Sequence, residues 1–312
     1  MYSDNCLITF FVAVIRLEFN RVDERSHQNT HGGMMLKNLF EPTLRLFCAL
    51  CVLTAVLTVP VAVQASEDTD CKTLTVSGNP EYPPLLWRST EKEGVLVGAV
   101  PALLREIVEP MGLEVVVRDL GSWARVQHVA RKGDIDMVAG AFITSERIGY
   151  MDYLLPPITH LPTAVWVPKG GEFIYRHWPD LLGKRGSTLI NNSFGQNFDR
   201  YADNNLQIEG VRSIEQSFKM ALAGRVDYVL YEVLQGQVKL DSLGVADRFE
   251  ALEPPVSREG LFFTFSKASP CNTFELREAI ADRLYKLVSA GRARQLIHDY
   301  TRLYRGTEGR EL

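Results

Sequence analysis

The feature that most constrains the fold is a short sequence unit that occurs twice, far apart in the chain. Residues 133–140 read GDIDMVAG and residues 224–231 read GRVDYVLY, each after a stretch with helical periodicity. Glycine readily takes the left-handed conformation that ends a helix. The apolar run after each aspartate is typical of a strand covered on both faces. The two copies therefore predict two similar α/β lobes with a cleft between them, and clefts are where small molecules bind.

The composition is that of an ordinary globular protein. The 312 residues are 46% hydrophobic and 23% charged, which is enough for one large or two modest domains. The net charge is −4, and proteins that bind nucleic acids favour basic domains, so no nucleic-acid partner is expected. The six histidines show no metal-ligand spacing, and no activated nucleophile is evident. We therefore expect no metal, no cofactor and no catalytic residue.

The N-terminal region has the pattern of an export signal. Residues 46–63 are almost wholly apolar, Lys37 and Arg45 precede them, and small residues lead up to Ala65. This pattern predicts a signal peptide over residues 1–65, cleaved after Ala65. The alternative is an uncleaved membrane anchor, because the apolar run approaches the length that spans a bilayer.

The stretch before Met34 and Met35 fits no export signal, so we expect translation to start at one of these two methionines. Cleavage would leave a mature chain that begins at Ser66. Of the five cysteines, only Cys71 and Cys271 remain in it. Two cysteines in an exported protein are a natural disulfide pair, and two separate buried thiols are the alternative.

Strand and helix signals alternate through the mature chain, which predicts a mostly parallel sheet in each lobe. Strands are expected at 73–77, 113–117, 135–141, 163–167, 187–191, 208–211, 226–231 and 261–265. Helices are expected at 101–111, 122–132, from 144, from about 194, at 213–224, and twice near the C-terminal end. Proline-rich stretches at 154–162 and 252–255 interrupt the alternation, and the first of them is interpreted as a crossing between the lobes.

Four segments resemble one known family when they are taken in order. They are YPP at 82–84, GDIDMVAGAFITSER at 133–147, LGKR at 182–185 and GRVDYVLYE at 224–232. Together they resemble the periplasmic solute-binding proteins of the polar amino-acid uptake class, bacterial extracellular solute-binding protein family 3. The similarity covers nearly all of residues 72–304.

The resemblance implies an α/β, two-lobed periplasmic-binding-protein fold of type II with two hinge crossovers. Lobe 1 would comprise residues 66–161, lobe 2 residues 162–257, and residues 258–312 would return to lobe 1. It further implies a periplasmic monomer that captures a small carboxylate-bearing solute, such as an amino acid, and delivers it to an ABC permease of the inner membrane.

Arg147 is the first candidate ligand-binding residue. It lies in the first turn of the helix that Thr144 opens, where a cation opposes the helix dipole. A bound anion would account for it, and a guanidinium grips a carboxylate through two parallel hydrogen bonds. The family uses the arginine of its Thr-x-x-Arg motif in this way. The alternative is a surface arginine paired with an acid.

Trp123 and Tyr82 are the candidate aromatic walls of the site. The family often places a stacking aromatic where Trp123 stands, and Tyr82 begins the aromatic-proline loop. An aromatic ring offers apolar contact and a π face for an ammonium group. The alternative for Trp123, early in a helix, is ordinary core packing.

Three further candidates depart from the family pattern. Glu232 stands where amino-acid binders carry an aspartate for the ligand's amino group, so the reach of the acid changes. The alternative for Glu232 is a helix N-terminal acid favoured by the dipole. Gly140 and Phe142 stand where the family commonly offers hydroxyl groups, so ligand contacts there would be backbone or apolar.

Asn191, Asn192 and Ser193 resemble the anion-contacting turn of the second lobe, with helix capping as the alternative. Arg125 shares a helix with Trp123 and is a candidate second cation. Asp136 and Asp227, one in each copy of the repeated unit, are interpreted as structural rather than as a catalytic pair.

Two other functions remain open. Some relatives of the fold are dehydratases that act on prephenate-like acids, and Glu232 could serve there as a general acid if closure raised its pKa. The chain could also be a sensor module whose closure is recognised by a signalling partner.

Overall fold

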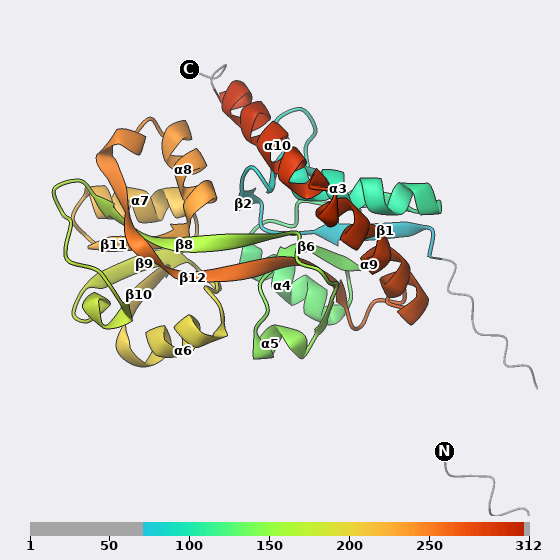
Figure 1. Cartoon of the computed structure of the whole chain (residues 1–312), viewed down its shortest axis with the longest axis horizontal. Helices are drawn as coiled ribbons and strands as arrows, with labels where there is room; N and C mark the ends of the chain where they lie inside the picture. Colours follow the sequence, from blue (N-terminus) through green and yellow to red (C-terminus); the bar gives the residue numbers. More distant parts are fainter. Residues whose placement is uncertain (1–70, 309–312) are drawn as a thin grey trace, which may run out of the picture. The chain divides into compact units, whose positions relative to one another are not determined.

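A computed structural model describes residues 71–308 (Figure 1). The predicted signal peptide and the two candidate start methionines lie outside these residues. None of the described helices is both long and apolar enough to cross a membrane.

Within residues 71–308, nine strands form a mixed sheet in the order β10-β9-β11-β8-β12-β6-β1-β5, with β7 beside β12. The strands of one half are β1 (Thr73–Ser77), β5 (Glu114–Val117), β6 (Met137–Ala141) and β7 (Met151–Tyr153). Those of the other are β9 (Arg185–Leu189), β10 (Gln207–Val211) and β11 (Tyr228–Glu232). We call these groups, with their helices, the first half and the second half. The strand of the first repeated unit, β6, pairs in parallel with β1, and the strand of the second, β11, pairs in parallel with β9, in agreement with the predicted parallel pairing.

Two long strands belong to both halves. β8 (Thr159–Pro168) and β12 (Phe249–Ser266) run antiparallel to each other, side by side between the two halves (Figure 1). The predicted interruption at 252–255 is wrong, because β12 continues through these residues. Its pairing with β8 shifts register between Leu252 and Ser257, and such an irregularity accommodates prolines that cannot donate to the ladder.

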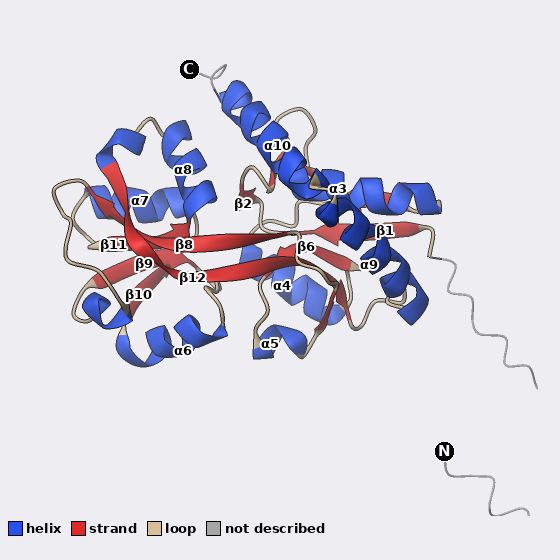
Figure 2. Ribbon diagram, in the orientation of Figure 1, coloured by secondary structure: helices blue, strands red, loops and turns tan. Residues whose placement is uncertain are grey.

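Helices cover both faces of the sheet (Figure 2). In the first half they are α3 (Ala99–Val108), α4 (Trp123–Lys132), α5 (Ser145–Ile148), α9 (Phe274–Ser289) and α10 (Arg292–Glu308). In the second half they are α6 (Gln196–Asn205), α7 (Ile214–Leu222) and α8 (Val233–Ser242). Short 3-10 helices occur at Glu109–Met111, Trp178–Leu181 and Ala246–Arg248. The predicted helix at 101–111 is thus an α-helix followed by a 3-10 turn.

Local signals place the helix ends as the sequence predicts. The Ser122 hydroxyl accepts a hydrogen bond from the Arg125 N–H at the start of α4, and Ser213 caps α7 in the same way. Gly133 ends α4 with a φ of 81°, a left-handed conformation that glycine takes without strain. The sequence missed α8, β7 and a small antiparallel sheet of β2 (Glu81–Tyr82), β3 (Leu86–Arg88) and β4 (Leu96–Val97).

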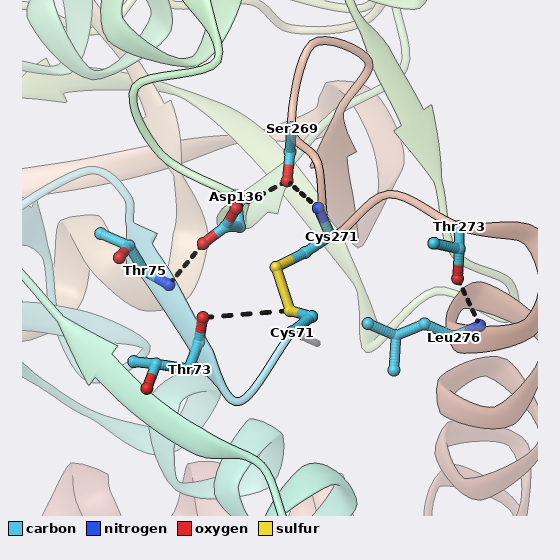
Figure 3. The surroundings of a disulfide bond; sticks show 8 residues. All are labelled: Cys71, Thr73, Thr75, Asp136, Ser269, Cys271, Thr273 and Leu276. Atoms are coloured by element: carbon cyan, nitrogen blue, oxygen red, sulfur yellow. Dashed lines mark hydrogen bonds between the residues drawn. A yellow bond between two sulfur atoms is a disulfide. The ribbon is translucent and has the colours of Figure 1, made fainter. Parts of the chain in front are cut away.

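The predicted disulfide is present in the first half. Cys71 and Cys271, separated by 200 positions in sequence, are bonded with their Cα atoms 5.5 Å apart (Figure 3). The bond joins the residues before β1 to the loop after β12. In that loop, Ser269 Oγ accepts from the Cys271 N–H and donates to Asp136 Oδ1 over 2.6 Å.

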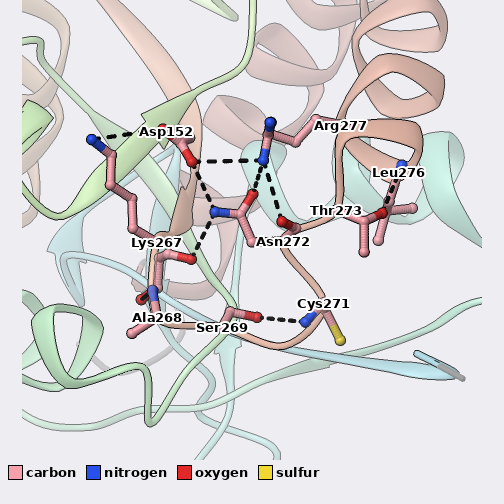
Figure 4. Close-up of polar contacts among 10 residues, drawn as sticks. Asp152, Lys267, Ala268, Ser269, Cys271, Asn272, Thr273, Leu276 and Arg277 are labelled. Atoms are coloured by element: carbon pink, nitrogen blue, oxygen red, sulfur yellow. Dashed lines mark hydrogen bonds and ion pairs between the residues drawn. The ribbon is translucent and has the colours of Figure 1, made fainter. Parts of the chain in front are cut away.

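A second set of polar contacts holds the same loop from its other side. Asn272 Nδ2 donates to Asp152 Oδ2 over 2.8 Å, and Arg277 Nη1 lies 3.6 Å from the same oxygen (Figure 4). The C-terminal helices therefore start from a loop that is anchored to β7 and, through the disulfide, to the residues before β1.

Candidate functional site

A small pocket lies where the two halves meet. Its lining from the first half consists of Asn79, Tyr82, Leu86, Trp123, Ala139, Gly140, Ala141, Phe142 and Arg147; the rest is Asn192, Glu232 and Leu261 of β12. The space inside the pocket is about 20 Å³, roughly enough for one water molecule. Seven of the eight predicted ligand-binding residues line this pocket, and Ser193 does not.

Arg147 is buried at the pocket, with 5% of its surface exposed. Thr144 caps the short helix α5 by accepting from the Arg147 N–H, which places the side chain in the first turn. The guanidinium donates from Nη1 to the Phe142 carbonyl over 3.2 Å and lies 5.4 Å from the centre of the Trp123 ring. Because it is buried and its side chain donates to Gln127 and to two backbone carbonyls, the alternative of a surface arginine paired with an acid is wrong.

Gln127 is a site residue that the sequence reasoning missed. Its Oε1 accepts from Arg147 Nε over 3.2 Å, and its Nε2 donates to the carbonyl of Asn191 in the second half over 3.3 Å. The same Asn191 carbonyl accepts from Arg147 Nη2. Gln127 follows Trp123 by four positions on α4, so the two share a helix face. This spacing is the sequence signal that could have identified Gln127 as a site residue.

The two aromatic candidates are both buried. Trp123 packs in an apolar cluster with Val126, and it also lines the pocket. Core packing and a position at the pocket are therefore compatible for this residue. Tyr82 meets the ring of Tyr231 edge-on, with ring centres 6.1 Å apart. Burial raises the pKa of Tyr82 well above its usual value, and the Glu232 carboxylate raises it further. The Tyr82 hydroxyl therefore stays protonated and available as a hydrogen-bond donor.

Glu232 is the most unusual group in the pocket. It ends β11 and precedes α8, but its carboxylate does not cap that helix. It is 1% exposed, and neither of its oxygens has a hydrogen bond of acceptable geometry within residues 71–308. Burial raises its pKa to about 7, and its own backbone N–H, the Tyr82 hydroxyl and the Arg147 charge oppose this rise only in part. A buried carboxylate without a hydrogen bond of good geometry is costly, so this position favours a bound donor or cation.

The pocket wall at the end of β6 is apolar. Gly140 has a φ of 106°, and a Cβ there would come within 3.3 Å of the Leu261 side chain. The Phe142 carbonyl is already occupied by Arg147 and by the Tyr153 hydroxyl. Gly140 and Phe142 thus line the pocket without any side-chain polar group.

Of the two candidate residues in the turn after β9, only one lines the pocket. Asn192 lines it, and its buried Nδ2 has no partner among the described residues. Ser193 instead donates to Asp199, which also accepts from the Phe194 N–H over 2.7 Å, so Ser193 stabilises the turn before α6. Arg125, the candidate second cation, is exposed and does not line the pocket.

Direct hydrogen bonds join the two halves around the pocket. Ser145 donates from its N–H and its hydroxyl to Gln196 Oε1, over 2.8 and 2.7 Å. The Tyr231 hydroxyl donates to the Glu81 carbonyl over 2.7 Å. Within the described residues, no group of three or more His, Cys, Asp and Glu side chains is placed to hold a metal ion.

This fold belongs to a class for which many solved structures exist. It is similar to the amino acid ABC transporter substrate-binding protein AbpA from Streptococcus pneumoniae bound to L-arginine, at 19% identity and a TM-score of 0.62. That match covers 75% of this chain and 96% of the other. An ancestral arginine-binding protein bound to glutamine matches at 21% identity, with 73% and 97% covered and a TM-score of 0.61.

A histidine kinase sensor domain with similarity to periplasmic binding proteins matches at 18% identity, with 73% and 96% covered and a TM-score of 0.62. Residues 74–302 match the model of the bacterial extracellular solute-binding proteins, family 3. The chain therefore belongs to this family. A comparison with curated protein sequences finds no significant match.

Proposed function

We propose that this protein is a periplasmic solute-binding protein that captures a small carboxylate-bearing solute, an amino acid or a close relative, for an ABC importer. The observation that carries the proposal is the presence of a buried arginine and a buried carboxyl group in one pocket. Arg147 comes from the first half and Glu232 from the second. A solute that bears both charges would bridge the two halves.

The solute's carboxylate would bind to Arg147. Nη1 and Nη2 each donate one N–H to a backbone carbonyl, which leaves a second N–H on each nitrogen for the two oxygens of a carboxylate. Trp123 and Tyr82 would contact the body of the solute. An amino group would bind to Glu232, whose oxygens form no hydrogen bond of good geometry within the described residues.

Solute entry requires the two halves to separate, because the space inside the pocket is about 20 Å³. We propose that residues 66–161 and 258–312 form one lobe, that residues 162–257 form the other, and that β8 and β12 are the hinge. Opening would break the Ser145–Gln196 and Tyr231–Glu81 contacts. Binding would shift the population toward the closed form that a permease in the inner membrane recognises. The proposal includes a cleaved signal peptide over residues 1–65 and a monomer in the periplasm.

The test is a thermal-shift and calorimetric screen of the protein against amino acids and small carboxylates. A ligand at about a thousand times its dissociation constant stabilises the folded state by roughly 4 kcal/mol. Arg147→Ala should weaken binding about 100-fold or more, because two charge-assisted hydrogen bonds contribute roughly 1.5–3 kcal/mol each. Arg125→Ala, an exposed cation on α4, is the matched control and should bind normally. Equal binding by Arg147→Ala would contradict the assignment.

One comparison favours a sensor as the second candidate function, since a histidine kinase sensor domain shares the fold. In that case the closed form would bind a signalling partner in place of a permease. Purification of the solute-loaded protein together with its inner-membrane partners would distinguish the two: a permease supports import, and a kinase supports sensing.

The dehydratase alternative also has one supporting observation. A carboxyl group with a pKa of about 7 is suited to act as a general acid near neutral pH. Incubation with prephenate or arogenate, followed by ultraviolet spectroscopy, tests it. Product formation that disappears in Glu232→Gln would favour the enzyme over the binding protein.

A further inference from the structure

The pocket where the two halves meet contains few side chains that can carry a charge. Among its described lining residues, Arg147 and Glu232 are the two whose side chains can carry a charge near neutral pH. The remaining polar side chains are those of Tyr82, Asn79 and Asn192, and all three are uncharged. Under the proposed function, on which this inference rests, the solute's carboxylate and ammonium groups would occupy Arg147 and Glu232. No lining charge would then remain for a third charged group.

The rest of the wall is apolar. It consists of Leu86, Trp123, Ala139, Gly140, Ala141, Phe142 and Leu261. An ion transferred to such surroundings without a partner loses several kcal/mol of hydration free energy, whereas an apolar group gains from the same transfer. The wall therefore discriminates against a charged side chain of either sign.

The space next to the pocket on the Asn79 side offers no better place for a cation. It shares Asn79 and Trp123 with the pocket and is lined further by Glu81, Arg88 and Arg212. The Glu81 carboxylate is already paired with Arg88 at 3.2 Å. A cationic side chain that extended in this direction would meet two arginines and an acid that is already engaged.

The space on the Asn192 side of the pocket likewise offers no better place for a cation. It shares Arg147 and Asn192 with the pocket, and its acids are Glu146, Asp199 and Asp203. Glu146 is exposed and paired with Arg131, and Asp199 is half-buried. Asp199 accepts from the Ser193 hydroxyl and the Phe194 N–H. Asp203, also in this lining, is exposed on α6, where solvent screens its charge.

We infer that the solute is an amino acid, or an amino-acid-like compound, whose side chain is uncharged. Apolar side chains would contact Leu86, Phe142 and Leu261, and amide or hydroxyl side chains would pair with the Asn192 Nδ2 group. Amino acids with cationic side chains are excluded as the preferred ligands, and the pocket lining offers no second cation to an anionic side chain.

Calorimetry with the exported protein tests this against three sets of probes. The first set is leucine, methionine, serine and glutamine, the second is arginine and lysine, and the third is aspartate and glutamate. The expected result is that at least one neutral amino acid binds about 10-fold or more tightly than every charged one. A charged amino acid as the tightest ligand would overturn the inference while supporting the proposed function. No binding by any probe would contradict both.

Asn79→Asp provides a gain-of-function test. Asn79 Oδ1 accepts from the Glu81 N–H over 3.0 Å, and an aspartate keeps this acceptor while adding a negative charge to the lining. The variant should bind arginine about 10-fold or more tightly than the wild type does. Asn204→Asp makes the same change on the exposed surface of α6 and should leave arginine binding unchanged. Equal gains in both variants, or no gain at Asn79→Asp in a folded protein, would count against a pocket limited by its charge. If Asn79→Asp does not fold, the wild-type panel alone decides.

Discussion

The two copies of the repeated unit perform the same task in the backbone and different tasks in the pocket. Asp136 Oδ2 accepts from the Thr75 N–H over 2.8 Å, and its own N–H donates back to the Thr75 carbonyl. Asp227 does the same with Arg185, at 2.7 Å for the first bond. Each aspartate thus ties the beginning of one strand to its parallel neighbour, which is the structural role expected from the sequence.

The residues that follow the two aspartates place different groups in the pocket. The strand of the first copy leads to Arg147, whose guanidinium is held by carbonyls and by Gln127. The strand of the second copy ends directly at Glu232, whose carboxylate forms no hydrogen bond of good geometry within residues 71–308. The repeat therefore specifies strand pairing, whereas the ionisable groups of the pocket come from the unrepeated residues that follow it.

The largest expected effect concerns the disulfide, which occurs in the first half only. Replacing both cysteines, as in Cys71→Ser with Cys271→Ser, should lower the free energy of unfolding by up to about 5 kcal/mol, since the bond closes a loop of 200 residues. Denaturant unfolding of the variant and the wild type measures this. A loss below about 1 kcal/mol would show that the hydrogen bonds of the loop after β12 suffice to hold it.

The next effect concerns the unpaired acid of the second half. Its raised pKa means that the folded state binds a proton more tightly than the unfolded state, so stability falls as pH rises from about 4.5 to about 7. Glu232→Gln removes this pH-dependent contribution to the free energy of unfolding. The variant should be more stable than the wild type by up to about 3 kcal/mol at pH 8 and nearly equal to it at pH 4.

Thermal unfolding of both proteins across this pH range measures the difference between them. Glu172, a fully exposed acid outside the pocket, offers a control in Glu172→Gln, which should not reproduce the gain at pH 8. A stability difference independent of pH would mean that Glu232 is not a buried, titrating carboxyl group.

The smallest effect separates the two aspartates. Asp136→Ala should cost about 2–3 kcal/mol, because the carboxylate holds both the Thr75 N–H and the Ser269 hydroxyl. Asp227→Ala should cost about 1 kcal/mol, since Asp227 is 41% exposed and its ion pair with Arg185 is long, at 3.6 Å. Denaturant unfolding of the two variants measures the costs. Equal costs would mean that the two copies are energetically equivalent.

Strands and helix ends were predictable where local chemistry decides them. Ser122, Ser213 and Gly133 act through bonds and dihedral angles within a few residues, so the sequence predicts them directly. The path of β12 was not predictable, because pairing with β8 carries the strand through prolines that would break an isolated one. The strands β2, β3 and β4 are too short to produce a pattern.

The residues of the candidate site also fall into two groups, those that the sequence predicts and those that only the structure shows. The sequence led to Arg147 through the Thr-x-x-Arg motif at a helix start, and to Glu232 through its place at the end of the second copy's strand, where the resembled family carries an acid. It did not lead to Gln127 or Leu261, since a helix side chain and a strand distant in sequence reach the pocket only after the halves pack together.

The sequence by itself determined the two α/β halves, the aspartates that tie their strands and the identity of the two charged groups. Tertiary structure alone decided that one charge is held by hydrogen bonds and the other is left unpaired. Burial and hydrogen-bond partners depend on residues brought together from distant parts of the chain, and no local pattern encodes them.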